Sequence, residues 1–195
     1  MHHPEQGEKD PLDGYQMIEP SVLQNTRRAV QEQGVDSLCV DDLTDADLSH
    51  IPWSGSALHI KHVAQELLRA QAGEIDYLAV RSPEGYPVSI GGVDYTKESD
   101  GGYLWQLGTH PQLRGLGIGT RLIREAERRI VERGKEWARL EVELDNPRAK
   151  ELYERLGYEV YGTTTDSWKQ LDEDGHEVVH TADLFQMRKR VSAVE

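Results

Sequence analysis

Arg114-Gly115-Leu116-Gly117-Ile118-Gly119-Thr120 is a glycine-rich stretch that stands between a segment with strand character and a segment with helical periodicity. Glycine at a strand-to-helix corner lets the backbone approach a ligand closely, and the successive N–H groups of such a turn can point at one anion. The ligand that this arrangement favours is a phosphate or a pyrophosphate. Because a tight corner also needs glycine for its geometry alone, the flanking segments have to decide between a phosphate site and a simple turn.

The segments before the glycines limit which kind of phosphate site this is. No Lys-Ser or Lys-Thr pair follows Gly119, so the stretch lacks the pattern of a nucleotide-hydrolysing P-loop. We predict three strands before it, over Ile75–Arg81, Pro87–Tyr95 and Tyr103–Thr109. The turn signal Pro83-Glu84-Gly85 and the pair Gly101-Gly102 connect these strands closely. The pattern predicts an antiparallel meander and not the parallel unit of a Rossmann fold.

The segments after the glycines have well-marked boundaries. A helix is predicted from about Gly117 to Arg133, and a strand follows over Trp137–Leu144, where apolar and acidic residues alternate. Asn146 is expected to cap the next helix, because Pro147 suits its first position and Gly157 suits its end.

The remaining elements lie upstream of the meander and at the C-terminus. We predict a strand over Asp36–Val40, a short helix from Thr44 to His50, a longer helix from Ser56 or Ala57 to Ala72, and a polar hairpin over Tyr158–Val191 that turns at Asp172–Gly175. The free edge of this hairpin leaves open a pairing with a second chain, and so a homodimer.

The composition predicts one domain. With 195 residues, of which 37% are hydrophobic, the chain can bury one substantial core. We expect this domain to cover residues 36–191, preceded by a disordered or loosely attached segment over residues 1–35. The formal net charge of −13 disfavours nucleic acid as a partner and favours cations, although an acidic surface also serves solubility alone.

The expected location of the protein follows from three features of the sequence. No apolar run is long enough to cross a bilayer, so no membrane contact is expected. The first 20 residues do not have the pattern of a secretory signal. The single cysteine, Cys39, cannot form an intramolecular disulfide, and its apolar neighbours predict a buried thiol. We therefore expect a soluble, cytoplasmic protein.

Two spaced motifs carry a resemblance to a known family. Written as Arg-x-x-Gly-x-Gly, residues 114–119 resemble the pyrophosphate-binding motif of the Gcn5-related N-acetyltransferase (GNAT) family. Leu107-Gly108-Thr109-His110-Pro111 is similar to the end of that family's fourth strand, and residues 146–158, with Asn146, Ala149, Tyr153 and Gly157, are similar to its second signature. The resemblance covers about residues 38–188. It implies an α/β (α+β) fold with a mixed, mostly antiparallel sheet of about six to seven strands, flanked by about four helices.

The resemblance also implies a cofactor site for acetyl-coenzyme A, which the family uses as a co-substrate. The pyrophosphate would lie on the backbone amides of the glycine-rich turn, with Arg114 adding charge and the helix N-terminus adding its dipole. The residues that this assigns to the cofactor are Leu107 and Thr109, through their main chains, Arg114, Gly115, Leu116, Gly117, Ile118, Gly119, Thr120 and Asn146. Asn146 has a second interpretation, as a helix cap alone.

The catalytic residues are inferred in the same way. By resemblance, Tyr153 is the general acid that protonates the leaving thiolate; its alternative role is that of a core tyrosine beside Leu152. Some members of the family have a glutamate base on the fourth strand, but Gln106 in that region cannot take a proton. Glu141 on the fifth strand is our candidate base, by its similarity to the branch that acetylates protein N-termini. A surface role for Glu141, or a water chain that ends on a backbone carbonyl, remains open.

The function that follows is the transfer of an acetyl group from acetyl-coenzyme A to a primary amine of a small molecule or a peptide. The acidic charge favours a cationic amine. Trp53, Tyr95 and Trp168 are candidates for the acceptor pocket, although core packing would also explain each of them. No metal site is predicted, because no cysteine or carboxylate pattern accompanies the histidine pairs His59/His62 and His176/His180. Two other functions remain open: a non-catalytic regulatory module that binds acyl-coenzyme A, and an unrelated nucleotide-binding protein.

Overall fold

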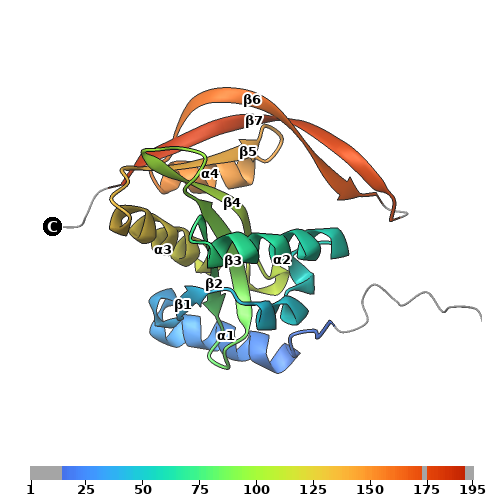
Figure 1. Ribbon diagram of the computed structural model, residues 1–195. Coiled ribbons are helices and arrows are strands. Elements are labelled where there is room, and N and C mark those ends of the chain that lie inside the picture. The colour runs from blue at the N-terminus through green and yellow to red at the C-terminus, as the bar shows by residue number, and fades with distance from the viewer. Residues whose placement is uncertain (1–14, 173–174, 192–195) are drawn as a thin grey trace, which may run out of the picture.

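Seven strands form one mixed sheet in the computed structural model, which describes residues 15–172 and 175–191 (Figure 1). The strands are β1 (Val40–Asp42), β2 (Ile75–Arg81), β3 (Pro87–Asp94), β4 (Gly101–Thr109), β5 (Trp137–Glu143), β6 (Glu159–Leu171) and β7 (Glu177–Arg190). Their order in the sheet is β1-β2-β3-β4-β5-β7-β6. Only β4 and β5 pair in parallel, and all other described neighbours are antiparallel. The predicted meander is thus confirmed as β2, β3 and β4.

Helices cover both faces of this sheet. They are the α-helices α1 (Pro20–Gln33), α2 (Ala57–Gln71), α3 (Ile118–Glu132) and α4 (Pro147–Arg155), and the short 3₁₀ helices η1 (Val35–Ser37), η2 (Asp45–His50), η3 (Pro52–Ser54) and η4 (Pro111–Leu113). Along β2, Leu78 and Val80 pack into a core cluster with residues of α1 and α3, whereas Tyr77 and Ala79 pack into a second cluster with residues of α2. This alternation puts α1 and α3 on one face and α2 on the other. None of the helices that the structure describes has both the length and the apolar character that a bilayer crossing requires.

Side chains cap the beginnings of two predicted helices, and the cap at Asn146 is the one that the sequence predicted. The Ser56 side chain accepts a hydrogen bond from the backbone N–H of His59 at 3.3 Å, and the Asn146 side chain accepts one from the backbone N–H of Ala149 at 3.1 Å. These bonds satisfy N–H groups that have no partner within the helix. The sequence signals for the beginnings of α2 and α4 are therefore confirmed.

The C-terminal hairpin extends well beyond the rest of the sheet. β6 and β7 pair from Glu159↔Arg188 to Leu171↔Glu177, but β5 pairs only with the Leu184–Arg190 part of β7. We call the outer part of the hairpin, residues 165–171 and 177–183, the arm. It arches over one side of the molecule (Figure 1). The predicted closing hairpin is confirmed, and part of its predicted turn lies outside the described residues.

Three expectations for the N-terminal part need correction. The predicted strand over Asp36–Val40 is displaced, because Val35–Ser37 form a 3₁₀ turn and the strand that pairs with β2 is Val40–Asp42. Cys39 is exposed, not buried. For residues 15–35, α1 replaces the expected loose segment, because Val22 and Leu23 are buried in the first core cluster. Residues 1–14 lie outside the described part of the chain.

A buried carboxylate fastens the region before α2 to β2, and it predicts a pH effect on stability. Asp47 accepts hydrogen bonds from the Arg81 guanidinium at 2.8 Å and from the backbone N–H of Thr44 at 2.8 Å. Burial alone would raise the pKa of the Asp47 carboxyl, but these hydrogen bonds outweigh burial and hold the pKa below its ordinary value. A carboxyl of this kind stabilises the fold above its unfolded-state pKa, and the stabilisation is lost as pH falls through the folded-state pKa.

We therefore expect Asp47→Asn to lower the free energy of unfolding at pH 7 by about 2 kcal/mol, as for the loss of hydrogen bonds to a charged group. The deficit should shrink as the pH falls below about 4, where the Asp47 carboxyl of the unfolded wild-type chain takes up a proton before that of the folded protein. Urea denaturation at pH 7 and at pH 3.5 measures both effects, with the exposed Asp45→Asn as the matched control. An equal deficit at the two pH values would contradict this assignment.

Candidate active site

The two parallel strands of the sheet separate into a fork. β4 and β5 pair only over Gly101↔Trp137, Gly102↔Ala138 and Tyr103↔Arg139. Beyond these three pairs, β4 and β5 do not pair with each other through their backbones. Gln106 and Leu107 stand opposite the single residue Gly91 on β3, which is a β-bulge, and Gln106 has a positive φ of 52°. A bulge bends its strand, and the Gln106 side chain is held by a 2.8 Å hydrogen bond from the Tyr77 hydroxyl. The bulge therefore directs β4 away from β5.

The glycine-rich turn follows β4 and leads into α3. Gly115 and Gly117 have φ values of 83° and 81°, in the left-handed region that disfavours other residues. Gly117 caps α3 without any side-chain hydrogen bond, so no side chain occupies the first N–H groups of the helix. A Cβ atom on Gly119 would lie 3.2 Å from the Thr109 hydroxyl, so the absence of a side chain leaves room there. Free amides beside open backbone fit a phosphate group.

Arg114 lies between the fork and the glycine-rich turn. Its Nε donates a hydrogen bond to the carbonyl oxygen of Thr109 at 3.3 Å. The Thr109 hydroxyl in turn lies 2.9 Å from the hydroxyl of Ser89 on β3. The end of β4 and the glycine-rich turn are thus tied together, which brings the predicted cofactor residues Thr109 and Arg114 into contact.

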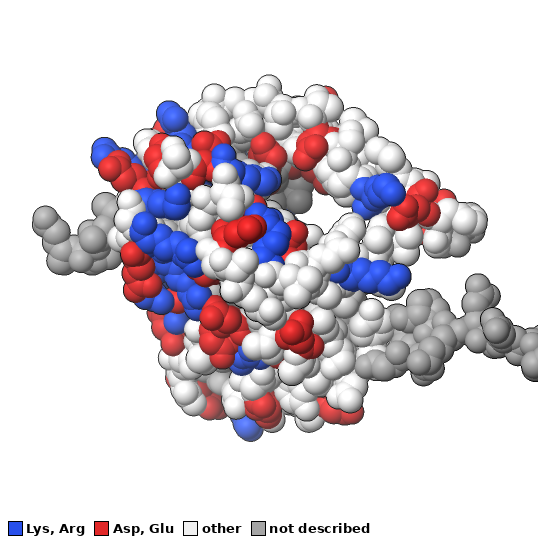
Figure 2. Space-filling model, viewed as in Figure 1, with Lys and Arg blue, Asp and Glu red and all other residues white. Residues whose placement is uncertain are grey.

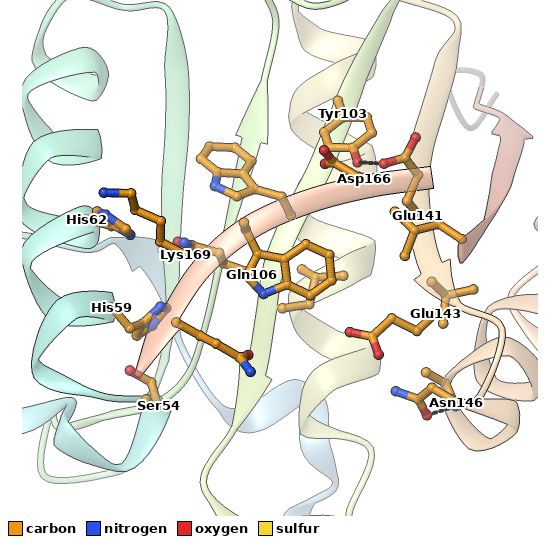
Figure 3. Close-up of a pocket in the computed structure, with 18 of the residues that line it drawn as sticks. Ser54, His59, His62, Tyr103, Gln106, Glu141, Glu143, Asn146, Asp166 and Lys169 are labelled. Carbon is orange, nitrogen blue, oxygen red and sulfur yellow. Dashed lines mark hydrogen bonds between the residues drawn. The ribbon is translucent and has the colours of Figure 1, made fainter. Parts of the chain in front are cut away.

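A pocket of about 620 Å³ lies beside the fork, between β4, β5, α2 and the arm. Its lining includes the predicted site residues Leu107, Glu141, Asn146 and Tyr153, and the close-up of its walls labels Glu141 and Asn146 (Figure 3). An opening between the arm and the body of the protein is visible on the surface (Figure 2). The structure therefore brings both predicted catalytic residues into one pocket, next to the fork.

Tyr153 lies on α4 and contributes to this pocket. Its ring packs edge-on against Tyr158 at a centroid distance of 6.0 Å, and burial raises the pKa of Tyr153 to about 12. Among the described residues, no group forms a hydrogen bond with its hydroxyl. At neutral pH the hydroxyl is therefore protonated and available as a donor.

Glu141 lies on β5 next to the last residue pair of the fork. The Tyr103 hydroxyl donates to its Oε2 at 2.7 Å, and the Gln186 side-chain amide donates to its Oε1 at 3.0 Å (Figure 3 shows the Tyr103 contact). Burial, followed by the bond to Glu141, raises the pKa of Tyr103 well above its ordinary value. Both carboxylate oxygens of Glu141 thus have a neutral hydrogen-bond donor.

Sequence reasoning missed several residues of the pocket. Glu143 on β5 and Trp105 on β4 line it, and so do Asp166 and Lys169 on the arm. The alternation of β5 could have indicated Glu143, because residues two apart on a strand share a face. The hairpin was expected near the acceptor pocket through Trp168, but nothing in the sequence indicates that Asp166 and Lys169 also line this pocket.

Of the three aromatic candidates for the acceptor pocket, one lines the pocket and two do not. Trp168 lines the pocket, on the arm. Trp53 packs against the core clusters and lies near His110 at a centroid distance of 5.6 Å. Tyr95 is buried and donates a hydrogen bond to Asp76 at 2.6 Å. His59 and His62 also line the pocket, but no group of three or more potential metal ligands is found in residues 15–172 and 175–191.

Comparison with solved structures gives the same architecture. The ribosomal-protein-S18-alanine N-acetyltransferase from Escherichia coli superposes with a TM-score of 0.58 at 21% identity, over 81% of this chain and 96% of that chain. The spermidine N-acetyltransferase from Vibrio cholerae, in complex with coenzyme A and spermine, has a TM-score of 0.60 at 16% identity. This match covers 80% of the present chain and 96% of that chain. A nourseothricin acetyltransferase has a TM-score of 0.51 at 22% identity, and the match covers 60% of the present chain and 66% of that chain. At these identities the similarity establishes the fold.

The forked sheet and the glycine-rich turn at the head of α3 thus belong to a fold that this chain shares with solved N-acetyltransferases. Residues 77–158 match the model of the acetyltransferase (GNAT) family. The matched residues contain the fork, the glycine-rich turn and Tyr153. Proteins of this family use an acyl-coenzyme A.

Proposed function

We propose that the protein transfers an acetyl group from acetyl-coenzyme A to a primary amine, with Tyr153 as the general acid. One observation carries this proposal. The Tyr153 hydroxyl is protonated at neutral pH, has no hydrogen-bond partner among the described residues, and belongs to the pocket beside the open fork. A thiolate that leaves at the fork needs such a donor.

The cofactor site of the proposal follows the chain from β4 into α3. Leu107 and Thr109 offer main-chain groups at the open side of the fork, and Arg114 adds a positive charge beside them. The pyrophosphate meets the amides of residues 115–120, at a helix N-terminus that no side chain caps. Asn146 uses its side-chain oxygen to cap α4, which leaves its amide N–H₂ for the cofactor. Acetyl-coenzyme A, when bound, supplies an acetyl group activated as a thioester.

In the proposed reaction, β5 supplies the proton acceptor for the amine. Glu141 is the candidate that the sequence provides, and it lines the same pocket as Tyr153. A water chain that ends on a backbone carbonyl is the alternative. A carboxylate within reach of the amine can accept the proton that the nitrogen must lose for the transfer.

The charges of the pocket support a cationic acceptor. Glu141, Glu143 and Asp166 all line it, and none of them forms an ion pair among the described residues. Of the two lysines in the lining, Lys169 already pairs with Glu177 at 2.9 Å and Lys97 lies over the Tyr103 ring at 3.7 Å. A small or peptidic amine with positive charge therefore fits better than an anionic one. Two proteins of the same fold are named for the alanine of a ribosomal protein and for spermidine, which are both amine acceptors.

Two measurements test this function. Titration calorimetry should show binding of acetyl-coenzyme A and no competition by ATP, which would exclude an unrelated nucleotide-binding protein. Release of free thiol from acetyl-coenzyme A is then screened with diamines, polyamines, aminoglycosides, amino acids and peptides. Binding without thiol release for any amine would favour the second candidate, a regulatory module that binds acyl-coenzyme A without turnover.

A further inference from the structure

The hydrogen bonds of Glu141 limit what its carboxylate can do. Tyr103 and Gln186 each donate to a different one of its two oxygens, at 2.7 and 3.0 Å. The donors come from β4 and β7, so this carboxylate links the two strands on either side of β5. Both oxygens of this carboxylate are therefore already occupied by donors of the protein. Glu141 therefore stabilises the closed end of the fork, where β4 and β5 are still adjacent.

Glu143 lies two residues farther along β5, on the same face. Two residues of a strand span about 7 Å, so its side chain begins nearer the open end of the fork. Its backbone is well fixed, because Glu143 pairs with Leu184 on β7 and its carbonyl accepts a hydrogen bond from the backbone N–H of Asn146 at 3.0 Å. The site of this carboxylate is therefore set by the sheet and by the beginning of α4.

The carboxylate of Glu143 itself has no partner among the described residues. No hydrogen bond or ion pair reaches its side chain, which is half-buried. It lines the pocket together with Tyr153 and Asn146, and its oxygens point from β5 toward the interior of the pocket (Figure 3). A carboxylate that lines a pocket and has no partner in the protein is available to a cationic ligand.

Resting on the function proposed above, we propose that Glu143 binds the ammonium group of the acceptor and takes its proton, whereas Glu141 is a positioning residue. Glu143 removes one proton from the ammonium and leaves a neutral amine. The nitrogen then forms its bond to the acyl carbon, the carbon–sulfur bond breaks, and Tyr153 gives its proton to the thiolate. The nitrogen loses a second proton, which restores the Tyr153 hydroxyl, and Glu143 releases the first proton to solvent. Protons and charges balance over the cycle.

The test compares glutamine substitutions in the full chain, with the most active amine of the screen. We expect Glu143→Gln to lower kcat/KM about 100-fold, at the lower end of the usual contribution of general base catalysis, with unchanged affinity for coenzyme A. Glu141→Gln should cause a smaller loss. Glu151→Gln is the matched control, since Glu151 is exposed on α4 and does not line the pocket. Added formate should restore part of the turnover of Glu143→Ala, because it returns a carboxylate to the site.

Each outcome of these experiments has a distinct meaning. Wild-type kcat/KM in Glu143→Gln would overturn the inference and leave the proposed function intact. A larger loss in Glu141→Gln would return the role of proton acceptor to Glu141. A loss in Glu143→Gln without rescue of Glu143→Ala by formate would overturn the proton transfer. The absence of thiol release by the wild type with every amine would instead count against the proposed function itself.

Discussion

Tyr153→Phe should lower kcat about 1000-fold and leave the affinity for coenzyme A close to that of the wild type. The substitution removes one oxygen atom and keeps the ring that packs against Tyr158. Because the hydroxyl forms no hydrogen bond within the described structure, its loss breaks no contact of the fold. The expected loss is therefore confined to proton donation to the thiolate. Single-turnover thiol release, together with calorimetry for coenzyme A, measures the two quantities separately.

Tyr158→Phe is the matched control for this substitution. Tyr158 is buried directly beside Tyr153, but it does not line the pocket. We expect its kcat to remain within a few-fold of the wild type. If Tyr153→Phe retained full turnover with every active amine, another group would have to protonate the thiolate, and Tyr153 would be a packing residue of α4.

The second large effect is expected in the glycine-rich turn. The double substitution Gly117→Asp and Gly119→Asp should weaken coenzyme A binding more than about 1000-fold, because two carboxylates would face the pyrophosphate and like charges at a contact cost several kcal/mol. The side chain added in place of Gly119 would also meet the Thr109 hydroxyl, which lies 3.2 Å from the position of the new Cβ. Calorimetric titration with coenzyme A measures the loss.

Backbone strain needs its own control, because Gly117 has a left-handed φ of 81°. Gly134→Asp places the same residue at a φ of 71° at the other end of α3, where no atom lies within 4 Å of the added Cβ. Thermal unfolding should show a comparable loss of stability for Gly117→Asp and Gly134→Asp, but only the former should lose coenzyme A. As a variant without strain, Arg114→Gln should weaken binding by charge alone. Tight binding by the folded double variant would show that the turn is only a corner.

The local features of the fold could be predicted from the sequence. Ser56 and Asn146 mark the beginnings of α2 and α4 because their side chains satisfy N–H groups of the same helix, which is an interaction over three residues. The meander followed from turn residues between short apolar runs. The displaced strand near Val40 was missed because its position depends on pairing with Val80, forty residues away.

The pocket depends on contacts that cross the sheet, and these are not visible in sequence spacing. Glu141 was chosen as the candidate base by its resemblance to the branch of the family that acetylates protein N-termini. Its partner Tyr103 lies 38 residues away and its partner Gln186 lies 45 residues away, and only the strand order brings them together. The unpaired state of Glu143 is likewise a property of the assembled sheet, because it depends on which cations the fold keeps away from it.

The arm gives the protein two parts that can change independently during evolution. Asp166, Trp168 and Lys169 face the pocket from a two-stranded ribbon that makes no further strand pairs within the described residues, whereas the fork and the glycine-rich turn belong to the central sheet and α3. Insertions or exchanges within the ribbon would alter the outer wall of the pocket without shifting the register of β4 or β5. New acceptors could therefore be acquired by descendants of this protein through changes in one hairpin, while the machinery for acyl transfer is inherited unchanged.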